Sequence, residues 1–121
     1  MAWVYLNGEV LAEEQARISV DDRGFLLGDG LFETMRAYGA VVFRLKMHLA
    51  RLRTSAEWLR IPFGPADDAV EEAIGKLLEL NACPDAYVRL TLTRGASQKG
   101  LRLDRPGRPT VLIRVRAFSP Y

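Results

Sequence analysis

The chain is poor in the side chains that build disulfides and most metal sites. It holds one cysteine, Cys83, and one histidine, His48, among 121 residues. A single cysteine excludes an internal disulfide, and a single histidine leaves no cluster with the spacing of metal ligands. We therefore expect no metal site. We also expect Cys83, which precedes a proline after an apparent helix end, to be a small semi-buried residue and not a nucleophile.

Long apolar runs are also absent. No stretch approaches the roughly 20 apolar residues that cross a bilayer, and the opening MAWVYLNGEV lacks the basic and apolar regions of a signal peptide. The composition, 49% hydrophobic and 26% charged, is typical of a globular protein. These features predict a cytoplasmic protein without a membrane partner, and the length predicts a single domain over residues 1–121.

Charge is distributed unevenly, although the net charge is only +2. Residues 61–86 carry six acids and one base, whereas residues 87–121 carry eight bases and one acid. A basic segment can indicate nucleic-acid binding, but these arginines lie within strand-like alternation and are not interleaved with several aromatic residues. The pattern favours an anionic small molecule or a partner surface over nucleic acid. A stand-alone module that binds anions or nucleic acid through this basic third is the alternative.

Hydrophobic periodicity predicts an α+β domain with a mainly antiparallel sheet and two helices. The first hairpin is marked by Asn7-Gly8, the preferred pair for a tight primed turn. The expected strands are residues 3–6, 9–11, 17–20, 31–38, 40–45, 87–94 and 110–118. The expected helices run from about residue 47 to 60 and from about Pro65 to near Asn81.

The stretch GFLLGDG at residues 24–30 packs three glycines into seven residues. It matches neither the dinucleotide-binding G-x-G-x-x-G nor the P-loop, and a strand is expected to follow it where both motifs require a helix. It is therefore not predicted to bind phosphate. Gly24 and Gly30 are expected to supply positive φ at sharp bends.

Alternation places Phe32 and Arg36 on one face of their strand and Glu33 on the other. Tyr87 and Arg89 likewise share a face of a later strand. Each of these faces therefore combines an aromatic ring with a guanidinium. Such a face is either solvated or forms a pocket wall that binds carboxylate, and alternation alone does not decide between the two.

Several spaced motifs occur together in the order DRGFLLGDGLFE at residues 22–33, HLARL at 48–52 and YVRLTLTRG at 87–95. With the N-terminal Asn-Gly hairpin they resemble the N-terminal domain of class IV (fold type IV) pyridoxal-phosphate enzymes. This family comprises branched-chain aminotransferases, D-amino-acid aminotransferases and 4-amino-4-deoxychorismate lyases. The resemblance implies the small α+β domain of a two-domain, homodimeric enzyme with pyridoxal phosphate as its cofactor.

The resemblance also implies roles for particular residues. Arg51, the arginine of H-x-x-R-L, would bind the cofactor phosphate, for which a planar guanidinium is well suited. The residues that match the family's substrate pocket are Phe32, Arg36, Tyr87 and Arg89.

The lysine that forms the family's Schiff base belongs to its second domain, as does the carboxylate that pairs with the pyridine nitrogen. Lys46, Lys76 and Lys99 stand in other contexts. The resemblance therefore implies that this chain contains no catalytic residue and is inactive alone, as one domain of a longer enzyme or a natural half-protein. His48 is expected to be structural, supporting the start of its helix.

The motifs of the subfamilies are mixed in this chain. Phe32-Glu33-Thr34 and the sequence at residues 98–101 resemble the lyases, whereas Tyr87-Val88-Arg89 resembles the branched-chain enzymes. Lys99 and Leu101 stand where D-amino-acid enzymes carry an R-x-H pair. The resemblance thus favours a lyase-like or broad-specificity transaminase acting on an amino acid or an amino-chorismate-type substrate.

Overall fold

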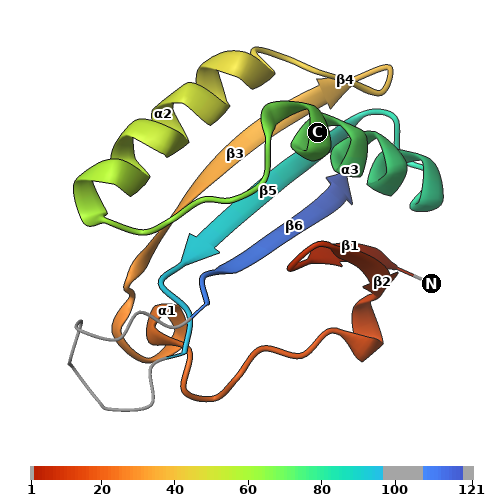
Figure 1. Ribbon diagram of the computed structural model, residues 1–121. Coiled ribbons are helices and arrows are strands. Elements are labelled where there is room, and N and C mark those ends of the chain that lie inside the picture. The colour runs from red at the N-terminus through yellow and green to blue at the C-terminus, as the bar shows by residue number, and fades with distance from the viewer. Residues whose placement is uncertain (1, 97–107, 119–121) are drawn as a thin grey trace.

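The chain forms a six-stranded antiparallel sheet with two long helices over one face, as the computed structural model shows for residues 2–96 and 108–118 (Figure 1). The strands are β1 (Trp3–Leu6), β2 (Glu9–Ala12), β3 (Gly30–Tyr38), β4 (Val41–Val42), β5 (Ala86–Thr93) and β6 (Thr110–Ala117). The helices are the 3-10 turn η1 (Glu13–Gln15), α1 (Arg23–Leu27), α2 (Leu45–Leu59) and α3 (Asp67–Leu80). The predicted α+β class and antiparallel sheet are confirmed.

The strand order is β2-β1-β6-β5-β3-β4, so the long strands β3, β5 and β6 form the middle of the sheet. β5 pairs with β3 from Thr93↔Gly30 to Ala86↔Ala37, and with β6 from Thr93↔Thr110 to Ala86↔Ala117. Only Ala37 and Tyr38 of β3 pair with the short β4. Within the described residues, the rest of β3 therefore has no strand along its outer edge.

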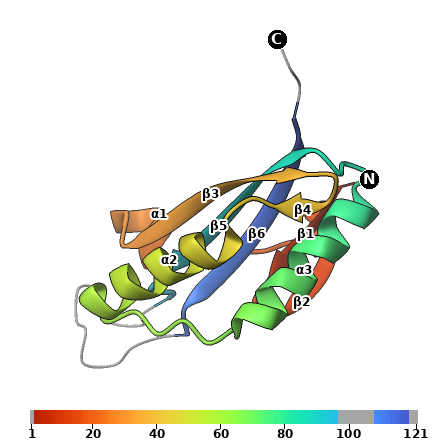
Figure 2. The same ribbon diagram turned by 90° about the horizontal axis from the view of Figure 1, so that it is seen from above.

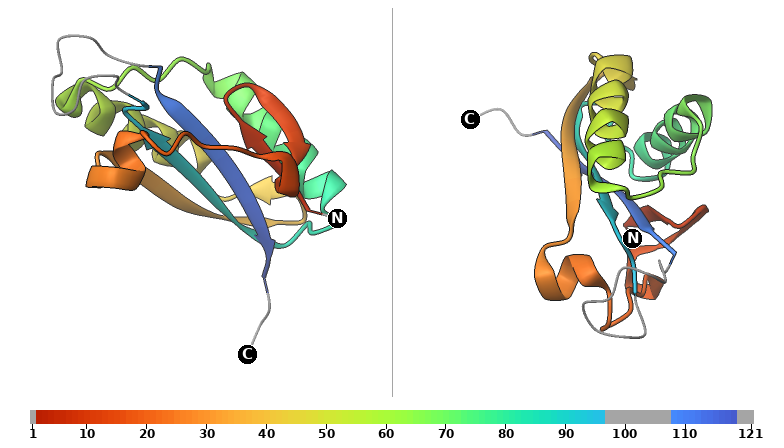
Figure 3. Two further views of the ribbon diagram at one scale, coloured as in Figure 1. Left: turned by 90° about the horizontal axis from the view of Figure 1, so that it is seen from below. Right: turned by 60° about the vertical axis from the view of Figure 1, so that its left-hand side comes forward.

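The core lies between the sheet and the helices α2 and α3, which cover the same face (Figures 1 and 2). Apolar residues at helical spacing on α2 and α3 meet the inward residues of β3 and β5. The fully buried side chains of this layer include Leu49, Leu52, Ile74, Leu77, Val88 and Leu90. In the described ranges no long helix covers the opposite face, and the short α1 lies at one end of the sheet (Figure 3). We call this opposite face of β3, β5 and β6 the open face.

Two expected strands are wrong in whole or in part. Residues 17–20 form no strand; Arg17 instead donates hydrogen bonds to nearby carbonyls of its own segment, and Val20 is exposed. The strand expected over residues 40–45 is reduced to Val41–Val42 because Arg44 takes the left-handed conformation, with φ of 57°, and turns the chain into α2. The other expected strands and both expected helices are confirmed within one or two residues at their ends.

The glycine stretch contains the short helix α1, which the sequence did not predict. Asp22 caps it by accepting hydrogen bonds from the backbone N–H groups of Gly24 and Phe25. The positive φ of 68° belongs to Gly28, so the expectation of positive φ at Gly24 and Gly30 is wrong. Those two glycines are needed for close approach: a Cβ on Gly24 would clash with the Thr93 side chain, and one on Gly30 would lie 2.5 Å from the backbone oxygen of Leu92.

Candidate functional site

Arg51 lies in the first half of α2, and its guanidinium is fixed by the carboxylate of Glu33 on β3. Its Nε donates to Oε2 at 2.9 Å, and its Nη2 donates to Oε1 at 2.7 Å. The Glu33 side chain is only 7% exposed, whereas that of Arg51 is 68% exposed. The pair thus has a buried, anchoring side and a side that faces outward.

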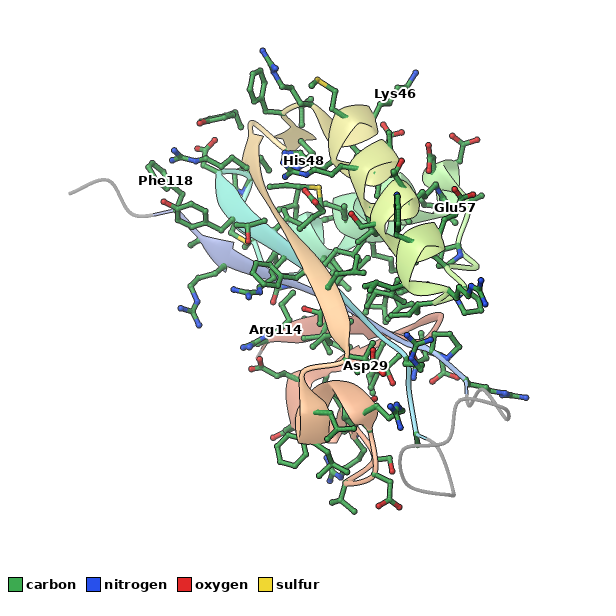
Figure 4. The ribbon with its side chains drawn as sticks, turned by 90° about the vertical axis from the view of Figure 1, so that its left-hand side faces the viewer. Asp29, Lys46, His48, Glu57, Arg114 and Phe118 are labelled. Atoms are coloured by element: carbon green, nitrogen blue, oxygen red, sulfur yellow. The ribbon has the colours of Figure 1, made fainter. Side chains whose placement is uncertain are left out.

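His48, one turn before Arg51 and labelled in Figure 4, contacts the same carboxylate. Its Nδ1 lies 2.7 Å from Oε1 of Glu33. Burial alone would raise the pKa of Glu33, but the hydrogen bonds and charges of Arg51 and His48 outweigh it and lower the pKa below its ordinary value. Glu33 also raises the pKa of Arg51 through hydrogen bonding and charge. Glu33 is therefore ionised at neutral pH and accepts from donors on two successive turns of α2.

The four candidate substrate residues lie together on the open face. The guanidinium of Arg89 lies over the Phe32 ring, 3.9 Å from its centroid. That of Arg36 lies 5.1 Å from the Tyr87 centroid and 3.9 Å from that of Phe118. These stacked geometries hold the cations against aromatic rings. The structure thus forms two pairs, Phe32 with Arg89 and Arg36 with Tyr87.

A hollow of about 330 Å³ opens beside these pairs and is lined by Thr34, Tyr87, Arg89, Arg114, Val115 and Arg116. Cross-strand pairing places Arg89 opposite Arg114 and Tyr87 opposite Arg116. Arg114 also pairs with the Glu13 carboxylate at 2.6 Å. The hollow is therefore rich in guanidinium groups, which suits a carboxylate-bearing molecule.

Arg51 does not join this cluster. Glu33, which fixes it, points to the helix side of β3, whereas Phe32 and Thr34 point to the open face. The candidate phosphate arginine and the candidate substrate residues thus lie on opposite sides of β3. In the described part of the chain no strand lies along the outer edge of β3 between Gly30 and Arg36, so only this one strand separates the two sides there.

Sequence comparison decides the family. The family described as amino-transferase class IV matches residues 30–121, about three quarters of the chain. The chain belongs to the class IV aminotransferases.

Three relatives of this class show how widely its named activities range. A protein of Methanocaldococcus jannaschii, provisionally named a branched-chain-amino-acid aminotransferase, is 43% identical over 108 residues, which are 89% of this chain and 38% of that protein. An aminodeoxychorismate lyase of Bacillus subtilis is 38% identical over 97% of this chain and 41% of its own length. A D-alanine aminotransferase of Staphylococcus epidermidis is 31% identical over all of this chain and 44% of its own length.

The fold of this class IV chain also matches solved structures. A branched-chain amino acid aminotransferase from T.th., solved with pyridoxamine 5'-phosphate, has a TM-score of 0.89 at 28% identity and covers 99% of this chain. The chain spans 41% of that structure, and about two fifths of the curated relatives it matches. The likeness confirms the expected fold of the N-terminal domain of this class.

The D-R-G-F-x-x-G-D-G block of this class IV chain is structural. The Asp29 carboxylate accepts from Nε of Arg23 at 2.9 Å and from Nε of Arg94 at 2.8 Å. Arg94 also donates to the carbonyls of Leu59 and Arg60 at the end of α2. Burial alone would raise the pKa of Asp29, but the two arginines outweigh it and lower that pKa. The block therefore anchors the start of β3 to β5 and α2.

Sequence reasoning missed Glu33, and a signal for it existed. Alternation placed Glu33 on the same face of β3 as apolar neighbours, and a charged residue on a buried face requires a partner. Phe118, which completes the ring cluster around Arg36, was also missed as a site residue. It lay at the end of the expected strand over residues 110–118, where alternation places it on the same face as Arg114 and Arg116; in the structure it directly follows β6. Figure 4 shows it on the side of the sheet away from α2.

The lysines and Cys83 were considered as candidates from the sequence. Lys46 on α2 and Lys76 on α3 are exposed and belong to the helix layer, away from the open face; Lys99 lies outside the described residues. Cys83 is buried, and burial raises the pKa of its thiol. Across residues 2–96 and 108–118, no group of three or more His, Cys, Asp or Glu side chains could hold a metal ion. No helix in these ranges is long and apolar enough to cross a membrane.

Proposed function

We propose that this chain is the small domain of a pyridoxal-phosphate-dependent class IV aminotransferase or lyase, and that it supplies the arginine for the cofactor phosphate and part of the substrate pocket. The observation that carries the proposal is the outward-facing guanidinium of Arg51, held on its inner side by Glu33. In this arrangement the arginine is both fixed and accessible, as an anion-binding group must be.

The donor chemistry of Arg51 fits a phosphate group. A guanidinium has five N–H donors, and the Glu33 carboxylate occupies Nε and one position on Nη2. Both hydrogens of Nη1 and the second hydrogen of Nη2 remain for acceptors on the exposed side. Two of them point in parallel, which is the geometry that binds two phosphate oxygens at once. Pyridoxal phosphate, when bound, supplies an electron sink for a substrate amino acid.

The open face supplies the substrate wall in this proposal. Arg89 over Phe32 and Arg36 over Tyr87 combine apolar surface with positive charge, which suits an amino acid with a carboxylate and a hydrophobic part. A ligand that meets both Arg51 and this wall would lie across the free edge of β3. The phosphate would then lie on the helix side and the reacting atoms on the open side.

The relatives support both transaminase and lyase chemistry for the whole protein, since their names include aminotransferases and an aminodeoxychorismate lyase. We place the lysine that carries the cofactor, and its proton transfers, on a second domain, because the described lysines lie on α2 and α3 and not on the strands of the open face. We further propose a cytoplasmic homodimer. The 121-residue chain alone should then bind a phosphate ester weakly and turn over no amino acid.

The test is a titration of the chain with pyridoxine 5'-phosphate, which has no aldehyde and cannot react with lysines. We expect Arg51→Ala to weaken binding by about tenfold or more, because the charge-assisted hydrogen bonds to phosphate are lost. Lys46→Ala is the matched control. It removes a positive charge from an exposed position in the same half of α2 and leaves the Arg51–Glu33 pair intact, so it should change affinity by less than about twofold.

Two outcomes would contradict the proposal. One is equal affinity of the Arg51→Ala variant and the unmodified chain for pyridoxine 5'-phosphate. The other is equal affinity of the unmodified chain for pyridoxine 5'-phosphate and for pyridoxine, which would show that the phosphate is not recognised. Turnover of an amino acid by the chain with pyridoxal phosphate would overturn the assignment of the lysine to a second domain.

A further inference from the structure

We propose that Glu33 is a positioning residue that presets the phosphate-binding edge of Arg51. This inference rests on the function proposed for Arg51 and adds a second residue, buried and on a different element, to the same site. Glu33 would touch neither cofactor nor substrate and would act only through the guanidinium.

The geometry of the pair supports this role. The side chain of Arg51 leaves α2 into solvent, and a free arginine there would populate many rotamers. The two hydrogen bonds to Glu33, at 2.9 and 2.7 Å, engage one side of the guanidinium plane and thereby fix both its position and its rotation. Only the side opposite Glu33 is left for an anion. A phosphate would therefore meet donors already in place and would not have to order the side chain on binding.

Glu33 is itself rigidly held, as a positioning group must be. Its backbone pairs with Leu90 in the middle of the β3–β5 ladder, and its side chain is nearly fully buried. His48 contacts the same carboxylate oxygen as Nη2 of Arg51. Since an ionised carboxylate only accepts hydrogen bonds, Nδ1 of His48 carries the hydrogen. Three donors from α2 thus fix the carboxylate before any ligand arrives.

The charge of Glu33 and its proposed positioning role predict opposite effects on phosphate affinity when the carboxylate is removed, so an experiment can distinguish them. A negative charge beside an anion site repels the anion, so removing the Glu33 charge should tighten phosphate binding if neutralisation of Arg51 were its only effect. Removing a group that orients Arg51 should instead weaken binding. A loss of affinity on removal of a negative charge therefore has no simple electrostatic explanation.

The experiment compares Glu33→Gln with Glu57→Gln, using pyridoxine 5'-phosphate as the probe and the ¹⁵N-labelled 121-residue chain. Glu57 is an exposed glutamate on the same helix as Arg51, so its variant removes an equal charge without touching Arg51 (Figure 4). The Nε–H signal of Arg51, assigned by its disappearance in Arg51→Lys, reports the orientation directly. We expect Glu33→Gln to weaken binding about three- to tenfold and to move this signal towards that of a solvated arginine.

Each outcome decides the inference. Unchanged or tighter binding by Glu33→Gln, while Arg51→Ala loses binding, overturns the positioning role and leaves the proposed function standing. Unchanged binding by Arg51→Ala removes the proposed function itself. If Glu33→Gln does not fold, Glu33→Asp takes its place: it keeps the charge but shortens the reach, so a positioning role still predicts weaker binding and a shifted Arg51 signal. Wild-type affinity and an unshifted signal in Glu33→Asp would equally overturn it.

Discussion

Glu33 and Arg51, 18 residues apart in the chain, are joined by two hydrogen bonds that connect the strand β3 to the helix α2. The contact is asymmetric: the carboxylate is buried and the guanidinium is mostly exposed. It therefore serves the fold at one end and an external anion at the other. Two carboxylates of this region, Glu33 within β3 and Asp29 just before it, also make the stability of the domain depend on pH.

Acid should destabilise the domain through these two carboxylates. The folded-state pKa values of Glu33 and Asp29 lie below their ordinary values, so each contributes stability that is present at neutral pH and is lost as pH falls through the folded pKa. We expect the free energy of unfolding in urea to decline below about pH 5. The decline should be shallower in Asp29→Asn. This variant should have a lower free energy of unfolding than the unmodified chain at neutral pH, and the difference between the two should shrink in acid.

An equal pH slope in Asp29→Asn and the unmodified chain would contradict this origin of the acid sensitivity. Glu57→Gln serves as the control for the loss of one exposed negative charge on the surface.

Glycine substitutions should have opposite effects at two positions. A Cβ on Gly30 would lie 2.5 Å from the backbone oxygen of Leu92, which cannot move without breaking the β3–β5 ladder. We expect Gly30→Ala to lower the free energy of unfolding by about 1–3 kcal/mol. Gly75, inside α3, has open space around its Cβ position, so Gly75→Ala should stabilise by about 0.5–1 kcal/mol. Thermal unfolding followed by circular dichroism measures both, and equal shifts would refute the steric assignment.

Asp22 should matter far more than its neighbour Asp21. Its buried carboxylate caps α1 and accepts hydrogen bonds from the hydroxyls of Thr93 at 3.0 Å and Thr110 at 2.6 Å. We expect Asp22→Ala to lower the free energy of unfolding by about 2 kcal/mol or more, through loss of the cap and of partners for two hydroxyls. Asp21→Ala, at an exposed carboxylate, should cost less than about 0.5 kcal/mol. Chemical denaturation compares the two, and similar losses would contradict the prediction.

Nucleic acid should not bind the basic open face. Two of its guanidiniums lie against aromatic rings, those of Arg36 and Arg89, and Arg114 pairs with Glu13. These arginines are thus held in place individually and do not form a row of free cations that could follow a phosphate backbone. We expect no change in the fluorescence anisotropy of a labelled single-stranded oligonucleotide at about 20 mM salt, a low ionic strength chosen to favour binding. Salt-dependent binding that Arg116→Ala weakens would instead support the stand-alone binding module.

Much of the fold follows from local sequence rules, and the exceptions have physical reasons. Asn7-Gly8 adopts positive φ at both residues, as a primed hairpin turn requires, and the helices follow their apolar spacing. The length of β4 was overestimated because the left-handed conformation at its end belongs to Arg44, and an arginine gives no sequence signal for that conformation as a glycine or asparagine would. The helix α1 was missed because its stability comes from Asp22, whose other partners lie 71 and 88 residues away.

The candidate site was predictable only in its parts. Alternation correctly grouped Phe32 with Arg36 and Tyr87 with Arg89 on single faces. The cross-strand register, which pairs them across strands as Arg89 over Phe32 and Arg36 over Tyr87, depends on the long β3–β5 ladder and cannot be read from either segment alone. The contact of Glu33 with Arg51 likewise depends on how α2 packs on β3.

Before Arg36, no described strand pairs with the outer edge of β3, and such an edge is a template for strand addition by another copy of the chain and hence for aggregation. Charged side chains on an edge strand can oppose such pairing. Glu33 does not, because its carboxylate is already buried and paired with Arg51. We therefore expect this edge to be the place where a further strand adds to the sheet.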